Sequence, residues 1–78
     1  MMNNKIQLSS GLSVTVTVLH FPTTYFIRCF SYADGEQKWL EVHQPSGRLT
    51  WNTGYTQSEL IELAGILTKN IADGLYSD

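Results

Sequence analysis

The stretch Leu12-Ser13-Val14-Thr15-Val16-Thr17-Val18 alternates between apolar and polar residues along its whole length. Successive side chains of a β-strand point to opposite faces of its sheet, and β-branched residues pack well on the pleated surface. The stretch therefore predicts a strand over residues 12–19, with its leucine and valines on one face of a hydrophobic core.

Turn-forming residues divide the chain on both sides of this stretch. Ser9-Ser10-Gly11 precedes it, and Pro22, which cannot donate to a strand ladder, places a four-residue turn at residues 20–23. Asp34-Gly35 is favoured in two-residue hairpin loops, because both positions need positive φ, and Pro45-Ser46-Gly47 forms the next turn. These short intervals predict an antiparallel meander of about five strands. The expected strands span residues 5–8, 12–19, 24–32, 37–43 and 48–52.

The loop lengths set the register between neighbouring strands, because a slip of one residue moves every side chain to the opposite face. The expected pairs are Val16 with Ile27, Val18 with Tyr25, Cys29 with Leu40, Ile27 with Val42, Val42 with Leu49, and Leu40 with Trp51. One face of the sheet then collects the apolar residues Leu12, Val14, Val16, Val18, Tyr25, Ile27, Cys29, Leu40, Val42, Leu49 and Trp51.

A helix is predicted over residues 57–73. Thr56-Gln57-Ser58-Glu59 has the pattern of a capping box, and Gly74 is a plausible terminator. Apolar residues recur at helical spacing, and a helix of this length spans about 25 Å, enough to cross the sheet. We expect one α+β domain over residues 1–78, with the helix packed on the valine face of the meander. If the helix packed on the other face, the valine face would be free for a dimer.

Composition limits the function classes. The chain has 78 residues, five Lys and Arg against seven Asp and Glu, and a net charge of −2. The basic residues are scattered, which argues against duplex DNA as a partner, because affinity for DNA depends on phosphate neutralisation. The single Cys29, a polar N-terminus and the absence of a long apolar run indicate a protein of a reducing compartment. We expect the cytoplasm of a bacterium or of a phage-infected cell.

The face opposite the valines is rich in aromatic residues. Cross-strand pairs are expected between Phe30 and Trp39, Arg28 and Glu41, and Phe26 and His43. Exposed apolar patches on monomers usually mark contact surfaces. The residues predicted to bind a partner are Phe26, Arg28, Phe30, Tyr32, Trp39, Glu41, His43 and Arg48.

The aromatic residues of this face also allow two interpretations without a foreign partner. A twisted sheet could cover them with the Phe21-Pro22 loop and the N-terminal residues, or a homodimer could stack two such faces.

Residues that could act in catalysis or bind a metal are sparse. His20 and His43 form no local ligand motif, and Cys29 falls on the expected core face, where a buried thiol is inert. We therefore expect no catalytic site, metal or cofactor.

These features favour a small protein-interaction module, an inhibitor or adaptor that docks through the aromatic face or adds a partner strand at an open edge. In size, acidity and layout from Lys5 to Asp78 the chain resembles the small accessory proteins of phages and mobile elements, including anti-CRISPR and other anti-defence inhibitors. That resemblance implies occlusion of a host enzyme or of a nucleic-acid channel.

Two alternatives remain. One is single-stranded nucleic-acid binding, with bases stacked on Phe26, Phe30 and Trp39 and phosphates held by Arg28 and Arg48. The other is a homodimeric structural protein.

Overall fold

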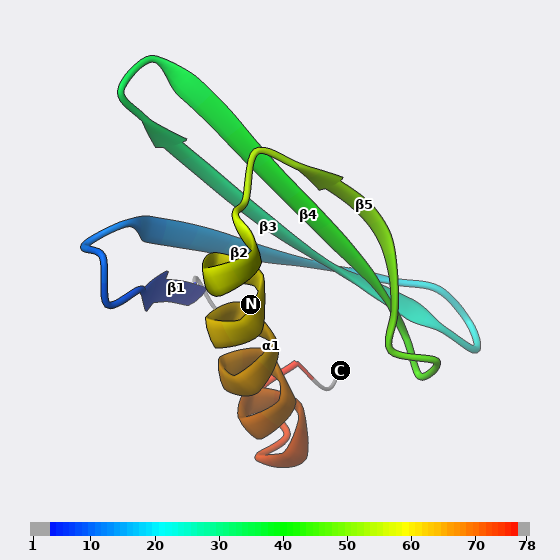
Figure 1. Ribbon diagram of the computed structural model, residues 1–78. Helices are drawn as coiled ribbons and strands as arrows, with labels where there is room; N and C mark the ends of the chain where they lie inside the picture. The colour runs from blue at the N-terminus through cyan, green and yellow to red at the C-terminus, as the bar shows by residue number, and fades with distance from the viewer. Residues whose placement is uncertain (1–3, 77–78) are drawn as a thin grey trace.

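The structure, a computed structural model, describes residues 4–76. It contains one antiparallel sheet with the strand order β1-β2-β3-β4-β5, followed by a single helix on one side of that sheet (Figure 1). The elements are β1 Asn4–Gln7, β2 Ser13–His20, β3 Tyr25–Ala33, β4 Glu36–Gln44, β5 Arg48–Thr53 and α1 Gln57–Ala72. The predicted α+β meander with a C-terminal helix is confirmed, and every predicted element end lies within one residue of the observed one.

The β3–β4 hairpin has the predicted register. Asp34 and Gly35 both adopt positive φ, at 53° and 76°. Cys29 lies opposite Leu40 and Ile27 lies opposite Val42. The two-residue loop therefore fixes the centre of the sheet, as the sequence predicted.

The predicted register between β2 and β3 was wrong by two residues. Val16 lies opposite Cys29 and Val18 opposite Ile27, so that the connecting loop covers residues 21–24 and His20 is the last residue of β2. The Phe21 N–H closes this loop by donating to the Thr24 carbonyl over 2.8 Å. Because the shift is an even number of residues, every side chain keeps its predicted face.

The predicted register between β4 and β5 fails at a β-bulge. Val42 lies opposite Leu49 as expected, but Glu41 lies opposite Trp51, so that β5 has one residue more than β4 between these two pairs. The extra residue is Thr50, whose hydroxyl donates to the Glu41 carbonyl and lies equally close to the Glu41 carboxylate, both at 3.1 Å. An extra residue reverses the alternation beyond it, and Trp51 consequently points away from the core face.

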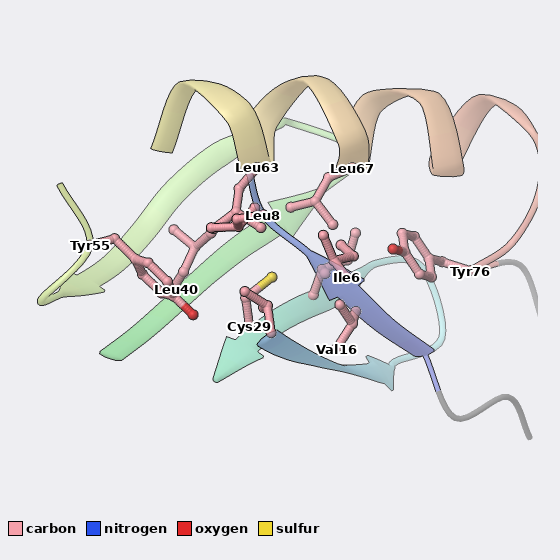
Figure 2. Close-up of a cluster of buried hydrophobic side chains, with 11 residues drawn as sticks. Ile6, Leu8, Val16, Cys29, Leu40, Tyr55, Leu63, Leu67 and Tyr76 are labelled. Carbon is pink, nitrogen blue, oxygen red and sulfur yellow. The ribbon is translucent and has the colours of Figure 1, made fainter. Parts of the chain in front are cut away.

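The core lies between α1 and the valine face of the sheet. Leu63 and Leu67 of the helix point toward strand side chains such as Val16, Cys29 and Leu40 (Figure 2). The full buried set is Ile6, Leu8, Val14, Val16, Ile27, Cys29, Leu40, Tyr55, Leu63, Leu67 and Tyr76. The expected coverage is incomplete, however, because Leu49 on this face is 47% exposed, and Trp51, which was expected here, lies on the other face and is 61% exposed.

Both ends of α1 have the predicted signals. The Glu59 N–H donates to the Thr56 hydroxyl and the Thr56 N–H donates to the Glu59 carboxylate, which completes the capping box. At the other end Gly74 has a φ of 76°, and the N–H groups of Gly74 and Leu75 donate to the carbonyls of Ile71 and Asn70. This pair of bonds is a Schellman motif, which satisfies carbonyls that have no partner within the helix.

Polar bonds attach the helix region to strand β4 and to the loop between β1 and β2. The Lys38 ammonium of β4 lies 3.1 Å from the Glu59 carboxylate, and the Ser9 backbone and hydroxyl donate to Glu62. Beneath them the hydroxyls of Ser31 and Tyr55 are hydrogen bonded over 2.8 Å, both within buried residues. These bonds fix α1 on one face and leave the other face of the sheet, in the part of the chain from residue 4 to 76, without a covering element.

Candidate functional site

The residues predicted to bind a partner all lie on the sheet face that α1 does not cover. Three cross-strand pairs occur as predicted: Phe30 with Trp39, Arg28 with Glu41, and Phe26 with His43. Arg48 extends the third row because it lies opposite His43. Tyr32 lies two pairs beyond Phe30 and Trp39 toward the β3–β4 loop, opposite Gln37. Strands β3, β4 and β5 thus bring together the eight residues that the sequence indicated.

An ion pair occupies the centre of this face. The Arg28 Nε donates to the Glu41 carboxylate over 2.7 Å. The hydrogen bond from Arg28 lowers the pKa of Glu41 below its ordinary value, and the bond from Thr50 acts in the same direction against the opposing effect of burial. The pair is charge-neutral, and both side chains remain partly accessible, so it can meet a polar group of a partner without leaving a bare charge.

Aromatic rings pack on either side of the ion pair. The centroids of Phe30 and Trp39 are 4.8 Å apart, and those of Phe26 and His43 are 5.1 Å apart. Phe21 from the β2–β3 loop meets Phe26 edge-on at 5.7 Å. These spacings are typical of attractive aromatic pairs, which hold the rings in place without help from a second layer.

The predicted self-covering of this face occurs only at one end. Phe21 covers part of Phe26, as expected for the Phe21-Pro22 loop. Of the N-terminal residues that were also expected to cover this face, the first three lie outside the described residues, and Asn4–Gln7 form strand β1 of the sheet itself. Tyr32 remains 64% exposed and Trp39 38% exposed. The rings nearest the β3–β4 loop and β5 are therefore accessible to a partner.

Trp51 belongs to this surface, and sequence reasoning missed it. The bulge at Thr50 turns its indole to the same side as Glu41. A shallow pocket of about 350 Å³ lies beside this indole, and it is lined by Arg28, Trp39, Leu40, Glu41 and Trp51. No glycine or proline in β5 marks the bulge. The regular alternation of Leu49 and Trp51 therefore predicted the wrong face for Trp51.

The end of the surface near the β4–β5 loop is ordered by side-chain bonds. Nδ1 of His43 lies 2.6 Å from the Ser46 hydroxyl, which also accepts the Arg48 N–H over 3.3 Å. His43 is half-buried and Arg48 exposed. The histidine is thereby held against the loop, while the arginine side chain extends into solvent.

Two findings concern reactive and metal-binding groups in the part of the chain that the structure describes. Cys29 is buried in the core, and burial raises its thiol pKa to about 12, which keeps it protonated and unreactive. Among residues 4–76, no group of three or more His, Cys, Asp or Glu side chains is placed to hold a metal ion. The described helix is too short and too polar to cross a membrane.

Comparisons with known proteins give no match. No family model matches the chain, and neither a curated protein nor a solved structure matches it. The surface around Trp39 and Trp51 must therefore be judged by its own geometry and chemistry.

Proposed function

We propose that the protein is a small interaction module that binds a partner protein through the uncovered sheet face, with Trp39 and Trp51 as its anchors. The observation that carries this proposal is the pocket in which two exposed tryptophans flank the Arg28–Glu41 ion pair. Tryptophan, tyrosine and arginine dominate the binding energy of protein interfaces, because large rings lose much water-exposed area with little loss of side-chain entropy.

The charge of the surface supports a protein partner. Arg28 and Glu41 neutralise each other, Arg48 adds one positive charge at the edge of this surface, and the chain as a whole has a net charge of −2. The aromatic rings beside the pair offer apolar contact area, and the pair offers both a donor and acceptors. Such a mixture of an apolar centre and polar groups resembles the composition of a protein interface more than that of a phosphate-binding groove.

The proposed module acts by occupying a surface of its partner, as an inhibitor or an adaptor. The resemblance to small anti-defence proteins of phages and mobile elements predicts the same mode of action. A cytoplasmic location, where a free cysteine such as Cys29 stays reduced, belongs to this proposal.

Single-stranded nucleic acid is the second candidate partner. Exposed rings lie on the same face as the exposed Arg28 and Arg48, and stacked bases with bound phosphates need this combination. The two candidates differ in their response to salt, because binding to nucleic acid releases counterions and weakens steeply as the ionic strength rises.

The first experiment compares wild type with Trp51→Ala and with Ile61→Ala. Ile61 is a matched control, because it is 65% exposed but lies on the helix, away from the proposed surface. Light scattering over a concentration series first establishes whether the aromatic face mediates self-association. Partners are then captured from a host lysate with each variant and identified, and binding to the purified partner is measured.

We expect Trp51→Ala to weaken binding of the purified partner about 30-fold, the loss typical of an interface hot spot, and Ile61→Ala to leave it unchanged. A dimer that Trp51→Ala dissociates would assign the face to self-association. Binding of a single-stranded oligonucleotide that is lost between low and physiological salt would favour the second candidate. Equal binding by all three proteins would refute the proposal.

A further inference from the structure

A second surface lies on the opposite side of the sheet, between α1 and strands β4 and β5. It is a groove with a volume of about 320 Å³. Buried Leu40 and Leu67 form its floor, and exposed Leu49 and Ile61 stand at its rim. The groove therefore opens from solvent directly onto the hydrophobic core.

The groove lies where α1 on one side and strands β4 and β5 on the other leave part of the hydrophobic core uncovered. The helix directs Leu63 and Leu67 into the buried cluster, and the residues beside them, Leu60 and Ala64, face β4 and β5 across the groove. A regular strand β5 would have placed Trp51 opposite Leu40, on the floor of this space. The bulge instead places Asn52 opposite Leu40 and sends the indole to the other face, which leaves the groove unfilled.

The lining defines the chemistry of an occupant. Within the described part of the chain, no charged side chain lines the groove. Of its polar residues, Thr68 donates its hydroxyl to the Ala64 carbonyl of its own helix, so the side-chain amide of Gln44 remains as the donor and acceptor for a ligand. A charged molecule would lose its hydration here without gaining a counter-charge, whereas an uncharged apolar molecule would extend the core.

The volume limits the size of the occupant. Small-molecule sites in proteins begin at about 300 Å³, and a dry cavity of about 150 Å³ holds one benzene ring. The groove is thus large enough for about two aromatic rings or a short alkyl chain. A stable interface between two protein chains buries about 800 Å² on each partner, far more than this narrow cleft offers.

We propose that the groove binds an uncharged, largely apolar small molecule of about two rings, oriented by one polar group toward Gln44. This binding site is distinct from the aromatic surface, because it lies on the opposite face of the sheet and shares only Leu40 with the outer pocket among the described lining residues. Its occupant would contact the floor residues Leu40 and Leu67 and would cover the exposed side chains at the rim.

The test uses 6-propionyl-2-(dimethylamino)naphthalene, an uncharged fluorescent probe with two rings, and its anionic relative 6-(dimethylamino)naphthalene-2-sulfonate. Both probes have the same ring system, so the comparison isolates the effect of charge. We expect wild type to enhance the fluorescence of the uncharged probe in a saturable titration, and to bind the anionic probe at least about tenfold more weakly.

Two adjacent helix positions provide matched variants. Both residues are exposed, but Ala64 lines the groove, whereas Gly65 does not, and a Cβ added at Gly65 would meet nothing within 4 Å. Neighbouring helix residues point about 100° apart, so Ala64→Glu places a carboxylate in the groove and Gly65→Glu places the same charge in solvent. We expect Ala64→Glu to weaken probe binding about tenfold or more, and Gly65→Glu to change it less than about twofold.

A third variant separates loss of binding from loss of folding. Ala64→Trp places a large apolar side chain over the groove, and it should also weaken probe binding about tenfold or more while circular dichroism and thermal unfolding show a folded protein. Trp51→Ala should leave probe binding unchanged, which distinguishes this site from the aromatic surface.

Three outcomes would overturn the proposal. These are no saturable binding of the uncharged probe by wild type, equal effects of Ala64→Glu and Gly65→Glu, or loss of probe binding in Trp51→Ala. A dimer in light scattering that Ala64→Glu dissociates and Gly65→Glu does not would assign the groove to a second copy of the chain instead.

Discussion

The two faces of the sheet differ in what covers them rather than in how apolar they are. On the inner face, beneath α1, small side chains such as Val14, Ile27 and Cys29 are fully buried. On the outer face Trp39 and Trp51, which are larger and carry more apolar surface, remain exposed. The comparison teaches that the fold is stabilised by the inner face, because only side chains removed from water on folding contribute hydrophobic free energy.

The largest effect should come from removing a helix side chain of the inner face. Leu63 has no exposed surface, and Leu63→Ala should lower the free energy of unfolding by about 2–5 kcal/mol through lost burial and a residual cavity. Trp51→Ala removes a larger side chain, but it should change the free energy of unfolding by no more than about 0.5 kcal/mol, because that side chain is exposed. Urea unfolding followed by circular dichroism measures both. A loss in Trp51→Ala as large as that in Leu63→Ala would break the comparison.

The next effect concerns Gly54, where the chain leaves the sheet for the helix. Its φ is 93°, and an added Cβ would lie 3.0 Å from the Lys38 Cγ and 3.2 Å from the Gln37 carbonyl oxygen. Gly54→Ala should therefore lower the free energy of unfolding by about 2–3 kcal/mol. Gly11 is a matched control, because its φ of 96° is similar but nothing lies within 4 Å. Gly11→Ala should cost only about 1 kcal/mol, and equal urea midpoints for the two variants would show that the close approach is unimportant.

A smaller effect of opposite sign is expected on the solvent side of α1. Gly65 lies within the helix with open space around its Cα, so Gly65→Ala should raise the free energy of unfolding by about 1 kcal/mol through helix propensity. The neighbouring Ala64→Gly should lower it by about the same amount. Thermal unfolding gives the comparison. Destabilisation by Gly65→Ala would show that this side of the helix is covered in solution.

The smallest effect is a pH dependence that differs between the faces. The Thr56 backbone bond, with the Lys38 ammonium, lowers the pKa of Glu59 below 4.5, and Arg28 does the same for Glu41. Because both pKa values are lower in the folded state, the resulting stability is present above pH 4.5 and is lost as the pH falls below it. Glu59→Gln should flatten this acid limb more than Glu41→Gln, because the Lys38–Glu59 pair is less exposed than Arg28–Glu41.

Urea midpoints measured between about pH 3 and pH 7, compared with wild type, give the size of each contribution. A larger flattening in Glu41→Gln would show that the outer ion pair stabilises the fold more than the pair that holds α1. It would mean that the outer face also contributes to the stability of the fold.

The centre of the sheet could be predicted because its geometry is local. Asp34-Gly35 admits few loop conformations, and the register of β3 and β4 follows from that loop alone. The helix start was equally predictable, since Thr56 and Glu59 interact within one turn. The β2–β3 loop is less constrained, because Pro22 excludes a ladder bond at one position but does not fix where the flanking strands end.

The bulge and its two consequences could not be predicted. Leu49 and Trp51 alternate as in a regular strand, while Thr50 is the extra residue and its hydroxyl contacts Glu41 on the neighbouring strand. That contact depends on how β4 and β5 pair, which the order of residues in β5 does not reveal. The position of Trp51 on the outer face and the groove beside Ala64 both follow from it.

The same bulge also affects how copies of the protein meet at high concentration. Strand β5 is the last strand of the sheet, and all of its residues are exposed. A straight edge strand offers a regular row of unpaired amides and carbonyls on which another chain can assemble into a fibril. The extra residue at Thr50 interrupts the spacing of that row, so the edge opposes open-ended polymerisation while the molecule keeps two tryptophans at its surface.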